Sequence, residues 1–301
     1  MIAAARGAIG PAASGVGAML KLIRVHQWIK NAFVAAPLFF TPHVIDVSNA
    51  MAVVAGILCF CAVSSSIYIL NDYVDREADR QHPKKRYRPL AAGTVAVPHA
   101  LTLMGLLAAG GLVGAAFLSP GFLNILGAYA ILNVLYCFWL KNLSIIDLIV
   151  ISAGFVLRVD AGAELVDAPP SVWIVLCTGF LAMFLAIAKR RDDVVTALGE
   201  THRKSLKGYN RSFLDSALVI VLGGVLVSYT IYTTDRAVMD SLGTERLYLT
   251  VPFVLAGVLR YLQITQVEER SGSPTRIVVT DLFLILTILG WVATFAVLIY
   301  G

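Results

Sequence analysis

The feature that most limits the fold of this chain is a series of long apolar runs with few charges in them. Residues 51–70, for example, contain no charged side chain. A helix needs about 20 consecutive apolar residues to cross the hydrocarbon core of a bilayer. Hydrophobic residues make up 58% of the chain, and the mean hydropathy is +0.79. We therefore expect an all-α polytopic membrane protein, with the lipid bilayer as its solvent.

Nine apolar blocks, separated by short polar or Pro- and Gly-containing joints, are candidate transmembrane helices. They lie at residues 32–48, 51–70, 98–118, 121–140, 144–166, 172–188, 213–234, 248–265 and 278–300. Pro37 and Pro42 interrupt the first block, which makes it the weakest candidate. Residues 19–30 mix bases with apolar side chains, as an interfacial helix does. The sequence thus predicts a mobile tail at 1–18 and a single transmembrane domain of about nine helices at 19–301.

The Lys and Arg residues indicate the orientation of the chain. With the N-terminus in the cytoplasm, the cytoplasmic joints hold all 24 Lys and Arg residues except Arg158, Arg236, Arg246 and Arg260. The positive-inside rule then predicts a multi-pass protein of the cell (inner) membrane with a cytoplasmic N-terminus. Because topology accounts for the net charge of +5, the charge gives no reason to expect nucleic acid as a partner.

Three aspartates follow the second apolar block in the longest cytoplasmic joint. Asp72, Asp75 and Asp79 are spaced i, i+3, i+7, so they share one face if the helix continues past its apolar part. Three carboxylates on one stripe repel each other, and a divalent cation with oxygen ligands, such as Mg²⁺, would hold them together. The alternative is a solvated acidic helix end that pairs with neighbouring bases.

Basic residues accompany these acids in two cytoplasmic joints. Lys85, Arg86 and Arg88 follow the aspartates, and Lys189 and Arg190 end the sixth block. Acids beside Arg and Lys at a membrane surface suit a substrate that carries several phosphates. Ordinary anchoring of the loops by positive charge is the alternative.

Other polar residues complete the candidate substrate-binding set. They are Arg24, Lys30, Asn31, Asn71, Tyr136, Lys141, Asp147 and Arg158. Arg24 and Asn31 are seven residues apart, so one helical face would present both to a cavity. Asp147 and Arg158 are eleven residues apart, about three turns, and should point together into the bundle because charges facing lipid are costly. Tyr136 and Lys141 end the fourth block on the cytoplasmic side, within reach of the same cavity.

These residues match a known pattern. Asn71-Asp72-x-x-Asp75-x-x-x-Asp79 after an apolar helix resembles the first aspartate-rich motif of the UbiA-type intramembrane prenyltransferases. The similarity runs from RVHQWIKN at 24–31 to the last block. It implies a nine-helix bundle, an active site that opens to the cytoplasm, and Mg²⁺. It also matches Arg24 and Asn31 to the polar pair that the family uses in its first helix.

The chain departs from the usual family pattern after the sixth block. Most members carry a second D-x-x-x-D motif there, whereas here Asp192 and Asp193 are followed by Val-Val-Thr-Ala within a basic segment. This combination resembles the branch that transfers 5-phosphoribose to a lipid phosphate for cell-wall arabinan synthesis. The resemblance implies phosphoribosyl pyrophosphate as donor, a polyprenyl (decaprenyl) phosphate as acceptor, and pyrophosphate as leaving group.

Within that hypothesis, Asp72 and Asp75 hold Mg²⁺ on the donor pyrophosphate, with Asp79 in support, and the bases hold phosphates. One alternative is a prenyltransferase of the same fold with an aromatic acceptor, which the missing second carboxylate pair disfavours. The other is a membrane transporter, which would place its ionisable residues near the midplane rather than at one surface. The polyprenyl length and a homo-oligomeric state stay open.

Overall fold

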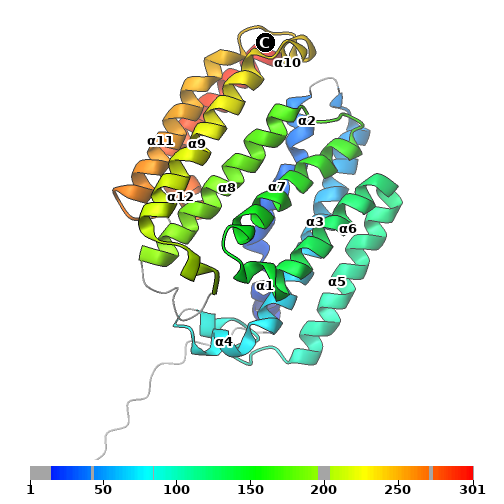
Figure 1. Ribbon diagram of the computed structural model, residues 1–301. Coiled ribbons are helices and arrows are strands. Elements are labelled where there is room, and N and C mark those ends of the chain that lie inside the picture. The colour runs from blue at the N-terminus through cyan, green and yellow to red at the C-terminus, as the bar shows by residue number, and fades with distance from the viewer. Residues whose placement is uncertain (1–14, 42–43, 84, 196–203, 271–273, 301) are drawn as a thin grey trace, which may run out of the picture.

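The computed structural model describes residues 15–41, 44–83, 85–195, 204–270 and 274–300, and in these ranges every regular element is a helix (Figure 1). In chain order the elements are α1 (Gly15–Ile23), η1 (Val25–Ala35), α2 (Ala36–Phe40), α3 (Val47–Val74), α4 (Arg76–Gln81), η3 (Lys85–Tyr87), α5 (Val97–Leu118), α6 (Pro120–Phe138), η4 (Leu140–Asn142), α7 (Ile146–Leu165), α8 (Val172–Val195), η5 (Lys204–Gly208), α9 (Arg211–Thr234), α10 (Arg236–Leu242), η6 (Leu247–Thr250), α11 (Val251–Gln266), α12 (Pro274–Thr280) and α13 (Leu282–Tyr300). The η elements are 3₁₀ helices.

The long helices confirm the predicted membrane bundle. In the described part of the chain, seven stretches are long and apolar enough to cross a membrane: α3, α5, α6, α8, α9, α13 and the η6–α11 stretch Leu247–Gln266. α7 matches the predicted block 144–166 but carries several charges. It packs against α6, α8, η1 and α3, and Asp147 and Arg158 on it are buried. The protein is therefore an integral membrane helical bundle, and the count of nine spans stays a prediction.

The prediction of one helix over residues 32–48 is wrong. The chain there runs through the 3₁₀ helix η1 and the short α2, which has Pro37 in its first turn, and α3 has already begun at Val47. η1 lies close against α7. A Cβ on Gly162 would come within 1.9 Å of the Val34 carbonyl oxygen, so only glycine allows this approach.

The start of the described chain also differs from expectation. α1 begins at Gly15, so residues 15–18 of the predicted tail are helical and Ala18 is buried, while residues 1–14 lie outside the described residues. The predicted continuous helix over 19–30 is interrupted at Arg24, whose φ of 55° is left-handed. Ala18 and Leu22 pack with Ile69 of α3. This packing fixes α1 against α3, and the turn at Arg24 lets the chain enter the bundle as η1.

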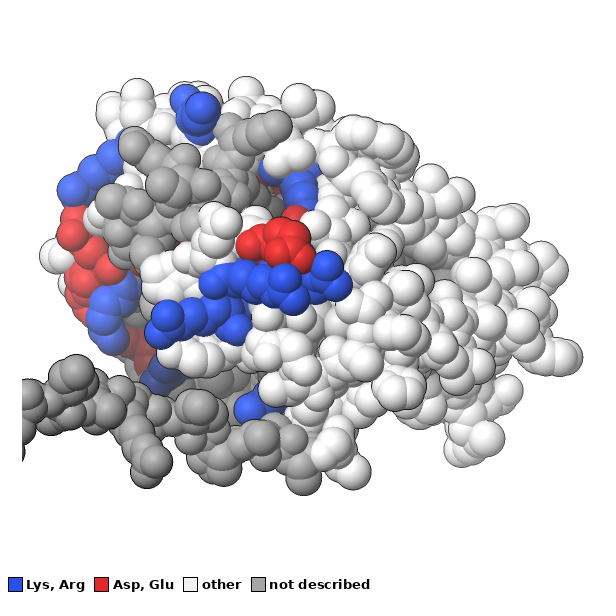
Figure 2. All heavy atoms as spheres, turned by 90° about the horizontal axis from the view of Figure 1, so that it is seen from below, with Lys and Arg blue, Asp and Glu red and all other residues white. Residues whose placement is uncertain are grey.

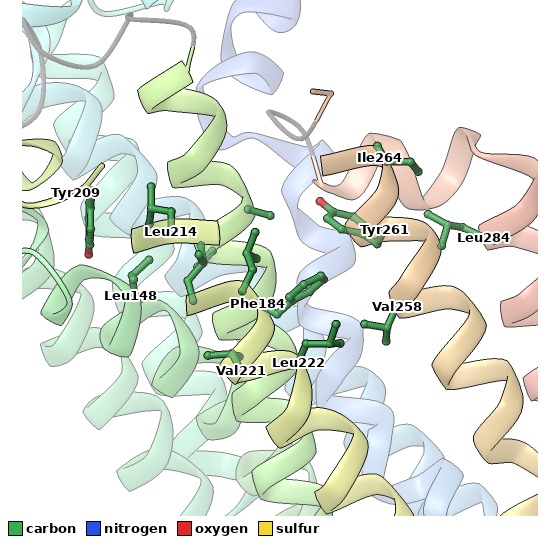
Figure 3. Close-up of a cluster of buried hydrophobic side chains, with 14 of the residues drawn as sticks. Leu148, Phe184, Tyr209, Leu214, Val221, Leu222, Val258, Tyr261, Ile264 and Leu284 are labelled. Carbon is green, nitrogen blue, oxygen red and sulfur yellow. The ribbon is translucent and has the colours of Figure 1, made fainter. Parts of the chain in front are cut away.

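The largest apolar core joins the C-terminal half of the bundle. In Figure 3, Phe184 of α8, Leu222 of α9 and Val258 of α11 point toward one another, and Leu284 of α13 belongs to the same buried cluster. A second core around Phe60 and Phe122 joins α3, α6 and α7. Helices that bury apolar side chains on each other in this way form a rigid frame for the polar residues at their ends.

The two ends of the bundle differ in character. α4 lies at one end in Figure 1 and α10 at the opposite end. We call them the α4 end and the α10 end. Figure 2 looks at the α4 end, where acidic and basic side chains gather on one face, while the flank visible in the same view is almost free of charge. The charged residues singled out in the sequence lie mainly at the α4 end.

Candidate active site

Two buried carboxylates at the α4 end share one guanidinium. Asp72 lies in the last turn of α3 and Asp79 in α4, and they are 2% and 3% exposed. Arg88 Nη1 donates to Asp72 Oδ1 at 3.0 Å and to Asp79 Oδ2 at 2.7 Å. Arg24 also donates to Asp72 Oδ1. Because buried charges need partners, these bases hold the two carboxylates at a common point.

Asp75 has a different partner from this pair. α3 ends at Val74 and α4 begins at Arg76, so Asp75 occupies the junction between two helices instead of one continuous stripe. Lys141 Nζ, on η4, donates to Asp75 Oδ1 at 2.5 Å and to Asn71 Oδ1 at 3.4 Å. The predicted shared face of three aspartates is therefore wrong. Asp79, expected only in support, is the residue that joins Asp72.

The donor set fits a divalent cation in part. No three His, Cys, Asp or Glu side chains come together as a metal-binding group in the described ranges. However, Arg88 Nη1 marks a point where a positive charge meets one oxygen of Asp72 and one of Asp79. All-oxygen carboxylate ligands suit Mg²⁺, which usually completes its shell with water and substrate phosphates. Asp72 and Asp79 together with substrate oxygens fit this coordination, whereas the predicted triad with Asp75 does not form among the described residues.

Arg24 is held in an unusual conformation. Its left-handed backbone is uncommon for a residue other than glycine. Its guanidinium pairs with Asp72 and lies 5.1 Å from the centroid of the Tyr68 ring. Strained backbone persists where the surroundings over-determine it, often at functional sites. Tyr68 was not singled out in the sequence, since nothing in its spacing marks it.

A group of bases that act on one another includes Arg24, the partner of Asp72. Lys30 is half-buried in η1, outside the seven candidate spans. Burial, followed by nearby positive charges, lowers the pKa of Lys30 to about 8. These charges belong, in order of effect, to Lys189, Arg158 and Arg24. These clustered positive charges produce a positive electrostatic potential, which favours a bound anion. We call Arg24, Lys30, Arg158 and Lys189 the basic wall.

Arg158 is a buried cation whose contacts are all neutral. Its Nε donates to Asn31 Oδ1 at 2.9 Å, its Nη1 to the Gly154 carbonyl at 2.6 Å, and its Nη2 to the Tyr129 hydroxyl at 2.9 Å. The guanidinium also lies 4.7 Å from the centroid of the Tyr129 ring. None of these contacts in the described structure is a carboxylate. Arg158 therefore adds uncompensated positive charge beside Lys30.

Asn31 takes a different place from the one expected. It is 1% exposed and donates to Cys61 Sγ and Ser64 Oγ at 3.2 and 3.3 Å while it accepts from Arg158. Arg24, by contrast, reaches Asp72, because the turn at Arg24 removes the common helical face. Asn31 therefore orients Arg158 in this structure.

Asp147 and Arg190 also differ from expectation. They are 0% and 1% exposed, and Arg190 Nε donates to Asp147 Oδ2 at 2.8 Å. The remaining nitrogens of Arg190 reach Asp193 Oδ2 at 3.3 Å and the Tyr136 hydroxyl at 3.5 Å. Each of the three nitrogens of this buried guanidinium thus already donates to a protein oxygen. Arg190 therefore forms a structural ion pair, and its phosphate contact stays a prediction. Asp147 is buried as expected, but its partner is Arg190 and not Arg158.

The two remaining predicted bases lie toward the surface in η3. Arg86 is exposed and donates to the Tyr87 hydroxyl at 2.8 Å, with its guanidinium 4.9 Å from the Tyr87 ring centroid. Lys85 is half-buried, and its backbone N–H donates to His82 Nδ1 at 3.3 Å. Of the bases predicted after the aspartates, Arg88 is the one that the structure brings to Asp72 and Asp79.

The chain is similar to proteins of known family over almost its whole length. The model of the UbiA prenyltransferase family matches residues 31–285. A decaprenyl-phosphate phosphoribosyltransferase of Mycolicibacterium smegmatis is 34% identical over 97% of this chain and 95% of that protein. The protein of the same name from Corynebacterium glutamicum is 33% identical over 94% of this chain and 86% of the relative.

The fold is also found among solved structures. A UbiA homolog from Archaeoglobus fulgidus, bound to GPP and Mg²⁺, superposes with a TM-score of 0.69 at 21% identity, covering 94% of this chain and all of that one. The same archaeal protein bound to DMAPP and Mg²⁺ superposes equally well, with a TM-score of 0.69. At this identity the likeness concerns the arrangement of helices and not the substrate.

Proposed function

This chain belongs to the UbiA prenyltransferase family, and from that premise we propose that it transfers 5-phosphoribose from phosphoribosyl pyrophosphate to a polyprenyl phosphate such as decaprenyl phosphate. It would act as an integral membrane phosphoribosyltransferase. Relatives that are 32–34% identical over most of the chain are named for decaprenyl phosphate and a phosphoribosyl group. The product would serve as a precursor of cell-wall arabinan.

The observation that carries this proposal is the basic wall beside the Asp72–Asp79 pair. Lys189 belongs to the segment where most family members are expected to carry a second acidic motif, and its positive charge acts on Lys30. A prenyl diphosphate brings one diphosphate group. Phosphoribosyl pyrophosphate with a lipid phosphate brings three separate phosphate centres, so extra bases in place of acids match the extra negative charge.

The proposed reaction needs no general base. An oxygen of the lipid phosphate, already ionised at pH 7, attacks C1 of the ribose from the side opposite the pyrophosphate. The bond between C1 and the pyrophosphate oxygen breaks, and its electron pair leaves with pyrophosphate. No proton moves, which agrees with a site built from carboxylates, Lys and Arg. The bases stabilise charge that develops on the leaving group.

Asp72 and Asp79 are the residues proposed to hold Mg²⁺, with Asp75 kept in place by Lys141. When bound, the ion would neutralise the pyrophosphate as it leaves. Arg88 and Arg24, which pair with Asp72 here, carry the charge needed to contact phosphate oxygens beside the ion. The UbiA homolog of Archaeoglobus fulgidus has been solved with Mg²⁺ together with GPP or DMAPP, which supports a role for the metal.

The proposed orientation puts the α4 end in the cytoplasm. The two joints richest in Lys and Arg, 71–97 and 189–211, adjoin the ends of α3 and α8, and the positive-inside rule assigns such joints to the cytoplasmic face of the inner membrane. Phosphoribosyl pyrophosphate would then reach the site from the cytoplasm. The exposed Arg86 would serve as a surface anchor. Because topology accounts for the basic residues, nucleic acid is not among the proposed partners.

The deciding experiment supplies membranes that contain this protein with phosphoribosyl pyrophosphate labelled in the ribose and with a polyprenyl phosphate. We expect label to enter the organic phase only when both substrates are present. Labelled lipid from a prenyl diphosphate and an aromatic acid, without any from phosphoribosyl pyrophosphate, would show that the chain is a prenyltransferase of aromatic acceptors instead.

Replacing Lys189 with alanine should weaken the binding of phosphoribosyl pyrophosphate. Lys189 is exposed at the end of α8, and its positive charge acts on Lys30. Loss of a charge-assisted contact typically costs about 1.5–3 kcal/mol, so the apparent affinity for phosphoribosyl pyrophosphate should fall roughly ten- to a hundredfold. Lys207→Ala provides the control, because Lys207 is an exposed lysine of η5 on the same side. Equal effects of both variants would mean that Lys189 only anchors the loop.

Removal of divalent cations should stop the reaction. With EDTA, the buried Asp72 and Asp79 keep only their bases as partners, and the pyrophosphate loses its neutralising ion. We expect turnover to fall to background and to return with Mg²⁺ or Mn²⁺, which also accept oxygen ligands. Transfer that continues undiminished in EDTA would refute the metal assignment but would leave the proposed phosphoribosyl transfer standing.

A further inference from the structure

Asp147 connects three segments that are distant in the sequence. Its carboxylate, buried in the first turn of α7, accepts from Arg190 Nε at 2.8 Å, from the Tyr209 hydroxyl at 2.7 Å and from Ser205 Oγ at 3.3 Å. These donors come from the end of α8 and from the segment 204–209 that includes η5. In a low-dielectric interior such hydrogen bonds are strong and directional. Asp147 therefore fixes the end of α8 and this segment relative to α7.

The backbone is packed tightly at the same place. Ile145 has a φ of 70°, which is unusual for a β-branched residue, and its N–H donates to the Tyr209 hydroxyl at 2.5 Å. Ser144 Oγ donates to the Ser205 carbonyl at 2.7 Å. A Cβ on Gly208 would lie 2.2 Å from Ser144 Oγ. Three separate features thus hold segment 204–209 against the start of α7.

Tyr209 is suited to bridge these groups. Burial, together with its hydrogen bond to Asp147, raises the pKa of Tyr209, so its hydroxyl keeps the proton that it donates. The same oxygen accepts from the Ile145 N–H. The ring stacks on Phe213 with centroids 6.0 Å apart. Replacing Tyr209 with phenylalanine would therefore remove only the bridge and keep the ring contact.

The contacts of Asp147 with Arg190, Tyr209 and Ser205 determine where Lys189 points, and we call them the junction. Arg190 is anchored by Asp147, Asp193 and Tyr136, and consecutive residues of a helix project about 100° apart. Fixing Arg190 therefore fixes the direction of the exposed Lys189, whose charge acts on Lys30. Without the junction, the last turn of α8 could rotate or fray, and Lys189 would spend less time at the basic wall.

We propose that Asp147 and Tyr209 are positioning residues that set the basic wall through Arg190, so that Lys189 meets a phosphate of the donor. Neither residue touches the substrate. The inference rests on the proposed function for the identity of the donor. It differs from that function in giving Asp147, which the sequence placed among the substrate-binding candidates, a positioning role through Arg190 instead of a contact with the donor.

A double-mutant cycle tests this coupling. The full-length protein in detergent is titrated with inorganic pyrophosphate in the presence of Mg²⁺, as wild type, Tyr209→Phe, Lys189→Met and the double variant. Tyr209→Phe should weaken pyrophosphate binding about five- to tenfold in the wild-type background. It should cause almost no further loss in the Lys189→Met background, because the residue through which it acts is gone.

Tyr261→Phe is the matched control. Tyr261 is a buried tyrosine of α11 whose hydroxyl has no hydrogen-bond partner among the described residues, so this variant should bind pyrophosphate like wild type. Should Tyr209→Phe fail to fold, Ser205→Ala removes only the 3.3 Å contact and should show a smaller loss with the same dependence on Lys189.

Two results with Tyr209→Phe would overturn the positioning role. One is an equal loss of affinity from Tyr209→Phe in both Lys189 backgrounds. The other is a lower melting temperature of Tyr209→Phe with unchanged affinity, which a purely structural junction would give. Absence of pyrophosphate binding by the wild type would overturn it as well. Since the cycle measures binding, a wild type that binds pyrophosphate but forms no labelled lipid would refute the proposed function and leave the junction to be decided by the cycle.

Discussion

Replacing Asp72 with alanine is expected to lower kcat/KM for phosphoribosyl pyrophosphate by at least about 100-fold, the scale seen when one preorganised charge-stabilising group is removed from an active site. Asp72 is 2% exposed and accepts from both Arg24 and Arg88. Its loss removes a proposed metal ligand and leaves two guanidinium groups without their shared counter-charge. Initial rates of lipid-linked product, measured over a range of donor concentrations, would give the value.

The control for this prediction is Glu77→Gln. Glu77 lies on α4, two residues before Asp79, but it is exposed and its ion pairs among the described residues are with Arg76 and Arg80. Such surface pairs contribute little. This variant should leave kcat/KM nearly unchanged. Asp79→Ala should approach the effect of Asp72→Ala, since both carboxylates meet Arg88. A fully active Asp72→Ala enzyme would refute the metal hypothesis. Unchanged activity of Asp79→Ala would mean that Asp79 only supports the metal ligands, as the sequence predicted.

Replacing Arg190 with alanine should strongly destabilise the protein. The change leaves Asp147, which is fully buried, without its only cationic partner among the described residues. Breaking a buried ion pair by removing one side typically costs about 3–5 kcal/mol. In a chain of this size the loss corresponds to a fall in apparent melting temperature on the order of 10 °C. Thermal unfolding in detergent, followed by the fluorescence of the tryptophans, would measure it.

Removing both charges tests whether the unpaired Asp147 carboxylate causes the loss of stability. The double variant Arg190→Ala with Asp147→Ala should recover part of the lost stability, because no unpaired charge stays buried. Arg86→Ala, at an exposed arginine, should have little effect. If Arg190→Ala instead unfolds like wild type and loses only donor affinity, then Arg190 binds a phosphate as the sequence indicated and the structural role is wrong.

Part of the candidate site could be predicted from the sequence because it rests on local spacing. Asp72 and Asp79 were recognisable from their position after an apolar helix, and so were the bases around them. Their pairing was not, because it depends on where the helix ends. A break at Asp75 turns that residue toward Lys141, 66 positions along the chain, and leaves Arg88 to join the other two. No periodic rule determines such a break.

The sequence by itself determined that the chain is a helical membrane protein with its chemistry at one end. The reason is general: hydrocarbon admits only long apolar segments that satisfy their own backbone hydrogen bonds, and charges must gather outside it. Only the tertiary structure decided which charges bind each other. Arg158 and Asn31 are 127 positions apart, and Arg190 and Asp147 are 43 apart. These pairs form because a buried charge must find a partner among whatever side chains the packed helices bring near, and that depends on all the helices at once.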